Sequence, residues 1–287
     1  MRIRITCETV AKLLFTIVAF SSLASLVLIA AFIFKEGFPF MLKVGLRDFL
    51  FSSNWNPPEG RFGILPMIVS SLYVTLGAML IGAPLGIAGA IFMNEFLPRR
   101  AMSVIKPVIE LLAGIPSVVF GFLGVMVLAP FIRAHLGGPG LSILAAAVIL
   151  GVMVLPTVIS ISTDALAAVP NSYREGALAL GATKWQSVRM VTVKAARSGI
   201  IASIILAMGR ALGETMAVIM VAGNTVRIPG AVTDPVRTLT ANIALEMSNA
   251  TGMAREALFA TGIVLFVLIM ILNGAALSTI KGKAART

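Results

Sequence analysis

The strongest constraint in this sequence is a series of long stretches with almost no charged residue. Each is long enough to cross the roughly 30 Å hydrocarbon core of a bilayer, which takes about 20 apolar residues in a helix. Hydrophobic residues make up 58% of the 287 residues and charged residues only 12%, against about 25% charged in soluble domains. These features exclude a water-soluble enzyme and predict an all-α polytopic membrane protein with six transmembrane helices. The six stretches are residues 13–34, 62–94, 111–132, 136–163, 198–226 and 257–280.

Three of these stretches need comment. Residues 62–94 exceed one straight crossing at 1.5 Å per residue, so part should lie outside the hydrocarbon core, or the helix should bend near Pro84. Residues 136–163 open with a Gly-Gly-Pro-Gly run, which predicts a tight turn at 137–140 before the helix. Residues 13–34 are longer than the apolar region of a signal peptide, and we interpret them as a retained first span.

The distribution of basic residues predicts the orientation, because Lys and Arg in short loops stay on the cytoplasmic side. Six spans place both termini on one side, and the segments on that side hold 14 Lys and Arg, whereas the opposite segments hold eight, together with six acidic residues. We therefore predict that both termini are cytoplasmic. The net charge of +11 is interpreted as an orientation signal, and no nucleic-acid partner is expected. The 14 are Arg2, Arg4, Lys12, Arg99, Arg100, Lys106, Arg174, Lys184, Arg189, Lys194, Arg197, Lys281, Lys283 and Arg286.

The sequence has few residues that could bind a metal, carry out thiol chemistry or bind a nucleotide. Cys7 is the only cysteine and His135 the only histidine, so one chain forms neither a disulfide nor a Cys/His metal cluster. The ATP-binding P-loop pattern is absent, since the only Gly-Lys pair is Gly282-Lys283 in the tail. We expect no cofactor in this chain, and ATP and Mg²⁺, if they drive it, must bind to another chain.

An inside segment, residues 164–197, is too long for a simple connector. After Pro170 it predicts two short helices, residues 172–180 and 183–190, separated at Gly181. Two interpretations are open. The segment is either an amphipathic element resting on acidic lipid head groups or a helix that docks in a groove of a soluble protein.

Two capping boxes are expected to start these short helices. Ser172 with Glu175, and Thr183 with Gln186, have the three-residue spacing at which two side chains satisfy the free N–H groups of a helix start. The spacing favours helices that begin at Ser172 and Thr183.

A pair of opposite charges interrupts the fifth stretch. Arg210 and Glu214 are four residues apart, which places them on one face of a helix. Arg210 lies 13 residues after Arg197, or roughly 20 Å deep. A charge at that depth costs at least about 2.5–3.5 kcal/mol and usually faces a protein interior or a water-filled path. Either the pair neutralises itself as a buried ion pair, or Arg210 attracts a permeating oxyanion while Glu214 holds its guanidinium.

The inside loop carries a family signature. Glu175-Gly176-Ala177 followed by Gly181 resembles the Glu-Ala-Ala, three residues, Gly motif of ATP-binding-cassette (ABC) importer permeases. Two positions depart from it: Gly176 replaces the second residue, and Lys194 stands where the family signature has proline. The resemblance implies that the loop is a coupling element to an ATPase.

Two further sequence runs narrow the resemblance to one group of ABC importer permeases. The run Gly-Arg-Ala-Leu-Gly-Glu-Thr-Met-Ala-Val at 209–218 and the run Gly-Ile-Pro-Ser-Val-Val-Phe-Gly at 114–121 are similar to permeases of the bacterial phosphate-specific importer, more the PstC-type than the PstA-type subunit. The likeness implies a type I ABC permease fold with its core in residues 71–276, the coupling loop at 164–197, an added first span and outer loop in 1–70, and a cytoplasmic tail in 277–287.

The resemblance also implies partners and site residues. The chain would be an inner-membrane, multi-pass permease for inorganic phosphate, surrounded by membrane lipids and catalysing no reaction itself. It would assemble with a second, PstA-type permease, two PstB-type cytoplasmic ATPases and a periplasmic PstS-type phosphate-binding protein. The substrate pathway would include Arg210 and Glu214, and the ATPase would contact Glu175, Gly176, Ala177, Gly181 and Trp185.

Three alternatives stay open: a permease for another oxyanion such as sulfate or molybdate, a stand-alone secondary transporter, and an intramembrane enzyme acting on lipid phosphates. The sequence shows no convincing internal repeat of the kind that secondary transporters use. One histidine, expected in a solvated outside loop, argues against the enzyme.

Other residues are assigned structural roles. Glu95 and Glu110 are interpreted as ordinary charges at the membrane interface. Glycines at helical spacing are expected to let helices approach closely; they are Gly82, Gly86, Gly89, Gly114, Gly121 and Gly124.

Overall fold

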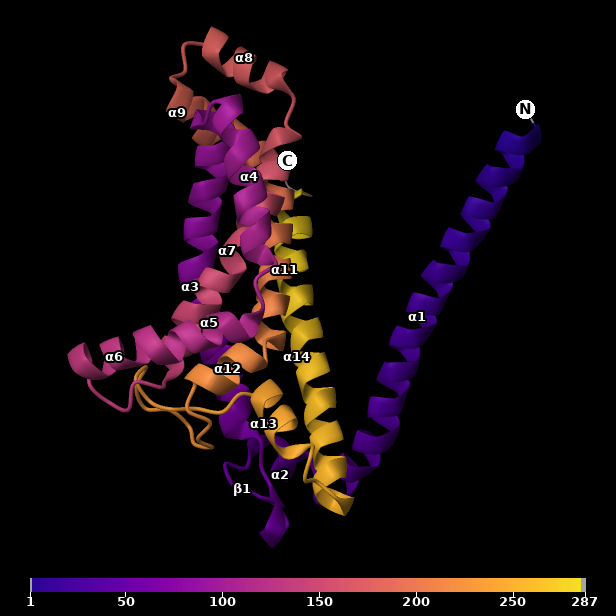
Figure 1. Ribbon diagram of the computed structural model, residues 1–287, viewed down its shortest axis with the longest axis vertical. Helices are drawn as coiled ribbons and strands as arrows, with labels where there is room; N and C mark the ends of the chain where they lie inside the picture. The colour runs from indigo at the N-terminus through magenta and orange to yellow at the C-terminus, as the bar shows by residue number, and fades with distance from the viewer. Residues whose placement is uncertain (1, 285–287) are drawn as a thin grey trace.

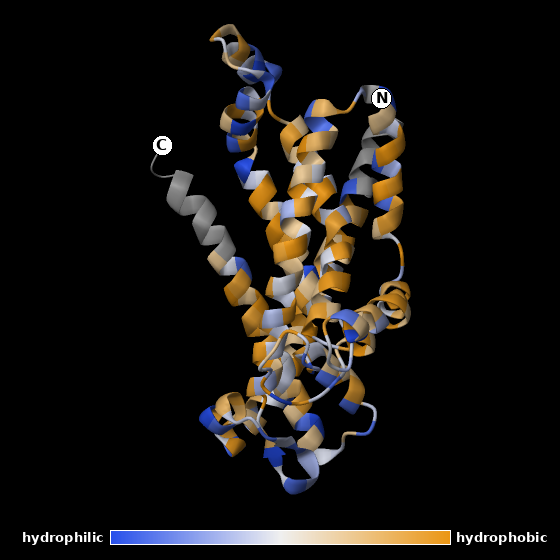
Figure 2. Ribbon diagram, turned by 90° about the vertical axis from the view of Figure 1, so that its left-hand side faces the viewer, coloured by the Kyte–Doolittle hydropathy of each residue, from blue (hydrophilic) through white to orange (hydrophobic). Residues whose placement is uncertain are grey.

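Four long helices stand side by side along the long axis of the molecule (Figure 1). They are α3 (Leu65–Ile91), α7 (Ile143–Ala167), α11 (Arg197–Gly213) and α14 (Gly252–Ala284). The computed structural model describes residues 2–284, and the side chains of residues 12–98 and 100–275. In Figure 2 the middle of this bundle is mostly hydrophobic, and hydrophilic residues gather toward its two ends.

The number of membrane spans agrees with the sequence pattern. Within the described residues, five helices are long and apolar enough to cross a membrane. A sixth is counted if Lys184–Ala195 and Arg197–Gly213, which meet at a bend of 68°, form one span. The predicted all-α, polytopic fold class is confirmed.

The most extensive contact in the bundle lies between α3 and α7. A Cβ atom at Gly82 would lie 2.4 Å from Cγ2 of Val154, and one at Gly86 would lie 2.7 Å from Cβ of Val158. These separations are too short for any side chain, so glycine allows the two backbones to approach. The close-packing role predicted for Gly82 and Gly86 is confirmed. Gly89 has more room, because the nearest atoms, on Ile159, would be 3.4 Å away.

The third predicted span is not one straight helix. The chain forms the amphipathic helix α4 (Arg99–Ala113), breaks at residues 114–116, and continues as α5 (Ser117–Leu123), the π-helical turn η3 (Gly124–Leu128) and α6 (Ala129–His135). The apolar crossing candidate is Ser117–His135, so the predicted start at residue 111 is wrong. In Figure 1, α5 and α6 run across the direction of the bundle. Pro116 explains the break, because it is the N-cap of α5 and restricts the residue before it.

The first helix is longer than predicted. Helix α1 (Arg2–Val44) continues past residue 34 through Lys35, Glu36 and Pro39. Charge ends an apolar stretch, but it does not end a helix. The lower part of α1 packs on α14, where the Phe32 and Phe259 rings meet edge to face at 5.5 Å. The upper part stands apart from the bundle in Figure 1, and its apolar side chains are exposed.

The end of the molecule opposite α8 (Asn171–Ala179) is built from short elements. Helix α2 (Leu46–Phe51) leads into a two-stranded hairpin, β1 (Trp55–Asn56) and β2 (Arg61–Phe62), with Trp55 paired to Phe62. The turn is the 3₁₀ helix η1 (Pro57–Glu59), and α13 (Leu239–Glu246) lies nearby in Figure 1. The Trp55 ring packs edge to face on that of Phe62 at 5.9 Å.

The loops divide between two ends of the molecule. Helices α8 (Asn171–Ala179) and α9 (Lys184–Ser187) lie at one end with the start of α1, and α2, β1 and α13 lie at the other (Figure 1). A chain with six spans requires these two groups of elements to lie on opposite sides of the membrane, and the structure places them at opposite ends. Which end faces the cytoplasm stays a prediction.

Candidate translocation and coupling sites

The fifth predicted span is interrupted beside Arg210. Helix α11 ends at Gly213, Glu214 is extended with φ −67° and ψ 130°, and α12 (Met216–Val221) follows. The prediction that Arg210 and Glu214 share one helical face is therefore wrong. Arg210 lies in the last turn of α11, where a cation interacts favourably with the helix dipole. Glu214 lies in the break.

The prediction that Glu214 holds the Arg210 guanidinium is also wrong. Its Oε1 accepts a hydrogen bond from the backbone N–H of Ala217 at 3.3 Å, and its carbonyl accepts one from Thr240 Oγ1 at 3.0 Å. Among the ion pairs of the described residues, none joins it to Arg210. Glu214 thus satisfies a free N–H group in the first turn of α12 and does not hold the guanidinium.

Arg210 is weakly held. Its Nη1 donates to Oγ1 of Thr157 on α7 at 3.5 Å, the upper limit for a hydrogen bond, and its side chain is exposed in the single chain. Its other donors form no hydrogen bond within the described part of the chain. A guanidinium presents paired N–H donors that match the oxygens of phosphate.

The two breaks lie in neighbouring segments. Helices α5 and α12 pack against each other, and a Cβ at Gly121 would lie 3.1 Å from Cα of Ala217. A Cβ at Gly124 would lie 2.5 Å from Cγ1 of Val221. The packing role of both glycines is confirmed. Non-helical backbone at membrane depth is tolerated where it is buried in protein or lines a water-filled cavity, and broken helices often form transport sites.

The second predicted capping box is present and the first is not. Thr183 Oγ1 accepts from the Gln186 N–H at 3.3 Å, and the Gln186 side chain accepts from the Thr183 N–H at 2.8 Å. Helix α8 starts at Asn171, one residue earlier than predicted, with Pro170 as its N-cap and no side-chain cap. Ser172 is therefore already inside the helix and cannot cap it.

The predicted separation of the two short helices at Gly181 is confirmed. Its φ of +84° lies in the left-handed region, which glycine adopts without steric cost. Helix α8 projects beyond the bundle in Figure 1. Glu175, Gly176 and Gly181 are exposed and Ala177 is half-buried. Leu180 is 91% exposed.

Trp185 lies apart from this surface, on α9. Its ring centroid is 6.5 Å from that of Phe96, at the end of the span that contains α3. Nζ of Lys184 lies over the same Phe96 ring at 4.8 Å. Of the five predicted ATPase contacts, Trp185 is thus placed beside a membrane helix, whereas Glu175, Gly176 and Ala177 lie on α8 and Gly181 lies in the turn after it.

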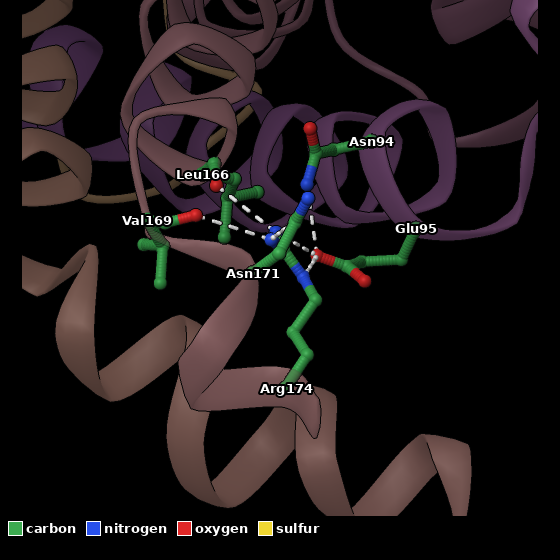
Figure 3. A network of polar contacts seen from close by, with 6 residues as sticks. All are labelled: Asn94, Glu95, Leu166, Val169, Asn171 and Arg174. Carbon is green, nitrogen blue, oxygen red and sulfur yellow. Dashed lines mark hydrogen bonds and ion pairs between the residues drawn. The ribbon is translucent and has the colours of Figure 1, made fainter. Parts of the chain in front are cut away.

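An ion pair that sequence reasoning missed joins α8 to the bundle. Nη2 of Arg174 lies 2.8 Å from Oε1 of Glu95, and the Glu95 side chain is only 6% exposed (Figure 3). The interpretation of Glu95 as an ordinary interface charge is therefore wrong. No spacing rule relates two residues 79 positions apart, so the sequence offers no signal for this pair.

Among the described residues, His135 and the acidic side chains form no metal site. His135 is the last residue of α6, not part of a loop, and its ring stacks on Phe131 at 4.4 Å. Within the described part of the chain, no group of three or more His, Cys, Asp or Glu side chains is arranged to hold a metal ion.

Together these features define a membrane transport subunit. The chain belongs to the family described as binding-protein-dependent transport system inner membrane component, whose sequence profile matches residues 82–278. Such a subunit is a multi-pass permease of the inner membrane and belongs to an ABC transporter. The predicted family is confirmed.

Curated relatives agree over most of their length. A probable ABC transporter permease protein, YqgH of Bacillus subtilis, is 45% identical over 268 residues, which cover 91% of this chain and 87% of that protein. The phosphate transport system permease protein PstC of Mesorhizobium japonicum is 38% identical and covers 84% of this chain and 80% of its own. PstC of Xylella fastidiosa strain Temecula1 is also 38% identical, over 241 residues.

Solved structures share the fold. The inward-facing MetNI methionine ABC transporter matches with a TM-score of 0.56 at 18% identity, over 77% of this chain and 94% of that one. A bacterial alginate ABC transporter matches with a TM-score of 0.59 at 15% identity, over 88% and 92%. The predicted type I permease architecture is confirmed.

Proposed function

We propose that this chain is the permease subunit of an ATP-driven importer that carries inorganic phosphate across the inner membrane. The observation that carries the proposal is its 33–38% identity to phosphate transport permeases over most of the chain. Arg210 supplies the chemistry that this substrate needs, because its guanidinium is permanently charged. Its single long hydrogen bond to Thr157 leaves donors for the anion.

Glu214 supports the pathway in a different way from the ion pair we expected. By accepting one hydrogen bond from the Ala217 N–H in the first turn of α12 and another from Thr240, it holds the break after α11 in shape. Arg210 then keeps its position relative to the packed segments α5 and α12. In this proposal Arg210 contacts the anion, and Glu214 positions the backbone around it.

Helix α8 is proposed to couple the path to ATP hydrolysis. Its exposed Glu175 and Gly176, with Ala177 and the Gly181 turn, would seat in a groove of a cytoplasmic PstB-type ATPase, which alone binds ATP and Mg²⁺. A PstA-type permease would complete the membrane part, and a PstS-type protein would deliver phosphate from the periplasm. ATP binding would shift the population of inward- and outward-open states, with both termini of this chain cytoplasmic.

The substrate is tested by competition. The permease is expressed with its ATPase, second permease and binding protein in cells without other phosphate uptake, and entry of radioactive phosphate is measured with excess unlabelled phosphate, sulfate or molybdate. We expect only unlabelled phosphate to reduce the signal strongly. Equal or stronger competition by sulfate or molybdate would assign the path to another oxyanion.

A further inference from the structure

Arg174 uses all its hydrogen-bond donors within the protein. Its Nε and Nη2 donate to Oε1 of Glu95 at 3.2 and 2.8 Å. Its Nη1 donates to the carbonyl of Val169 at 3.2 Å and to Oδ1 of Asn171 at 3.1 Å, and Nη2 also donates to the carbonyl of Leu166 at 3.1 Å (Figure 3). A guanidinium has five N–H donors in a fixed plane, and five bonds are formed. Neither lysine nor histidine has five N–H donors in one plane.

These bonds join three separate segments. Glu95 lies in the π-helical turn η2 (Phe92–Phe96), which continues α3. Leu166 belongs to the last turn of α7, and Val169 follows it. Arg174 itself is in α8. One side chain therefore connects the projecting helix to the ends of the two helices with the most extensive contact in the bundle.

Apolar packing does little to hold α8. None of its residues is buried, and only Arg174 and Ala177 are half-buried. The Arg174 side chain is 21% exposed and that of Glu95 6%, so this ion pair is shielded from water and its hydrogen bonds are stronger than those of a surface pair. The orientation of α8 thus depends on Arg174 more than on hydrophobic contacts.

The connection leads onward to the proposed substrate path. Helix α7 carries Thr157, which contacts Arg210 on α11. It also carries Ser162, whose hydroxyl lies 2.9 Å from that of Ser203 on α11 in a buried contact. A displacement of α8 that moves the end of α7 is therefore expected to move α11, the helix that carries Arg210.

We propose that Arg174 is a positioning residue that, through Glu95 and the end of α7, makes α8 move as one body with α3 and α7 and so links ATP hydrolysis to phosphate movement. The inference rests on the proposed coupling role of α8. Lysine cannot replace it, because an ammonium is a point charge with three donors and does not reach Glu95, Asn171 and both carbonyls together.

The experiment measures the number of phosphate ions imported per ATP hydrolysed. The complete importer, with its ATPase, second permease and binding protein, is reconstituted in lipid vesicles and supplied with inorganic phosphate and ATP. Variants Arg174→Lys and Glu95→Gln are compared with Lys106→Gln. The Lys106–Asp164 pair is a matched control, because its N–O distance is also 2.8 Å but its side chains are 36% and 63% exposed.

We expect the ratio to fall at least fivefold in Arg174→Lys and Glu95→Gln, with assembled complex recovered within twofold of the wild type. Lys106→Gln should keep the wild-type ratio within twofold. A merely structural role would lower uptake and hydrolysis together and leave the ratio unchanged. An unchanged ratio in both variants overturns the inference.

A double variant guards against misfolding of the single ones. Glu95→Leu with Arg174→Met removes both charges, so no buried charge is left unpaired. We expect it to assemble and hydrolyse ATP with a ratio at least fivefold below the wild type. A normal ratio, or failure to assemble, overturns the inference, since the pair would then serve folding alone. If the wild-type complex instead takes up phosphate without hydrolysing ATP, the proposed function is contradicted, and this inference with it.

Discussion

Arg210 is the residue on which substrate selection rests in this account. Arg210→Ala should reduce phosphate uptake at least tenfold while the complex still assembles, because the permanent cation in the path is lost. Arg210→Lys should also be impaired, since the ammonium keeps the charge and loses the planar fork. Thr157→Val is the control: it removes only the 3.5 Å bond to Arg210 and should change uptake less than twofold. Uptake of radioactive phosphate is the measurement, and normal uptake by the alanine variant would make Arg210 structural.

Asp234 gives a pH prediction in the loop between α12 and α13. Hydrogen bonds from the backbone N–H groups of Gly230 and Ala231, and then the charge of Arg227, lower the pKa of its carboxyl. Because the folded pKa lies below the unfolded one, the carboxylate stabilises the loop at pH values above the unfolded pKa of about 3.9. That stabilisation is lost as the pH falls through the lower, folded pKa.

Amide hydrogen exchange tests this prediction. Protection of the Gly230 and Ala231 amides, which lie 2.8 and 3.1 Å from Oδ2 of Asp234, should stay constant from pH 7 to about 4 and fall below that. Asp234→Ala should lose the protection at every pH. Equal protection in the variant and the wild type would show that the carboxylate does not order the loop.

At this scale, the sequence identifies charged residues but not their partners. The depth of Arg210 follows from its place in an uncharged stretch, whereas its contact with Thr157 depends on how α7 lies beside α11. The expected pairing of Arg210 with Glu214 assumed a continuous helix, and the helix ends at Gly213. The Arg174–Glu95 pair needs the tertiary fold, because η2 and α8 are far apart in the chain.

The coupling element gives a prediction at the scale of helices. Gly181→Leu forces a branched side chain into the left-handed region, which costs on the order of 1–2 kcal/mol and should displace α8 relative to α9. Glu175→Lys reverses an exposed charge on α8 without touching the bundle. Both should reduce co-purification of the ATPase and phosphate uptake several-fold.

A control for these variants comes from Gly176. A Cβ there would meet no atom within 4 Å, and alanine in place of glycine inside a helix gains roughly 0.5–1 kcal/mol. Gly176→Ala should therefore leave α8 folded, so a loss of ATPase association in this variant would report on the docking face of α8 and not on loss of the helix. Undiminished association and uptake in both Gly181→Leu and Glu175→Lys would remove the reason to regard α8 as a docking element.

Helix bounds were predictable where a turn signal borders an apolar stretch, and less so elsewhere. The expected turn at 137–140 precedes α7, which begins at Ile143. Helix α1 was underestimated because charged residues continue a helix outside the apolar stretch. The break between α4 and α5 was missed because residues 111–132 carry no charge, and hydropathy does not report the restriction that Pro116 places on the backbone.

The topology of the whole molecule is predicted by the excess of basic residues in one set of loops. Asn54 and Thr183 are both exposed, so the side of the membrane, not burial, decides whether a cysteine placed there reacts. In a chain with Cys7→Ser, Asn54→Cys should react with an impermeant thiol reagent in intact cells. Thr183→Cys should react only after the membrane is opened. The reverse pattern would place α8 outside, where no ATPase can reach it.

Reconstitution in vesicles tests whether this chain is the phosphate path of an importer driven by a separate ATPase. The purified complex is reconstituted with ATP and the ATPase on one side and the binding protein with radioactive phosphate on the other, and phosphate accumulation is measured over time. We expect accumulation that requires ATP, stops when the ATPase is omitted and is lost in Arg210→Ala. Accumulation by this chain without ATP or the ATPase, driven by an ion gradient, would contradict it.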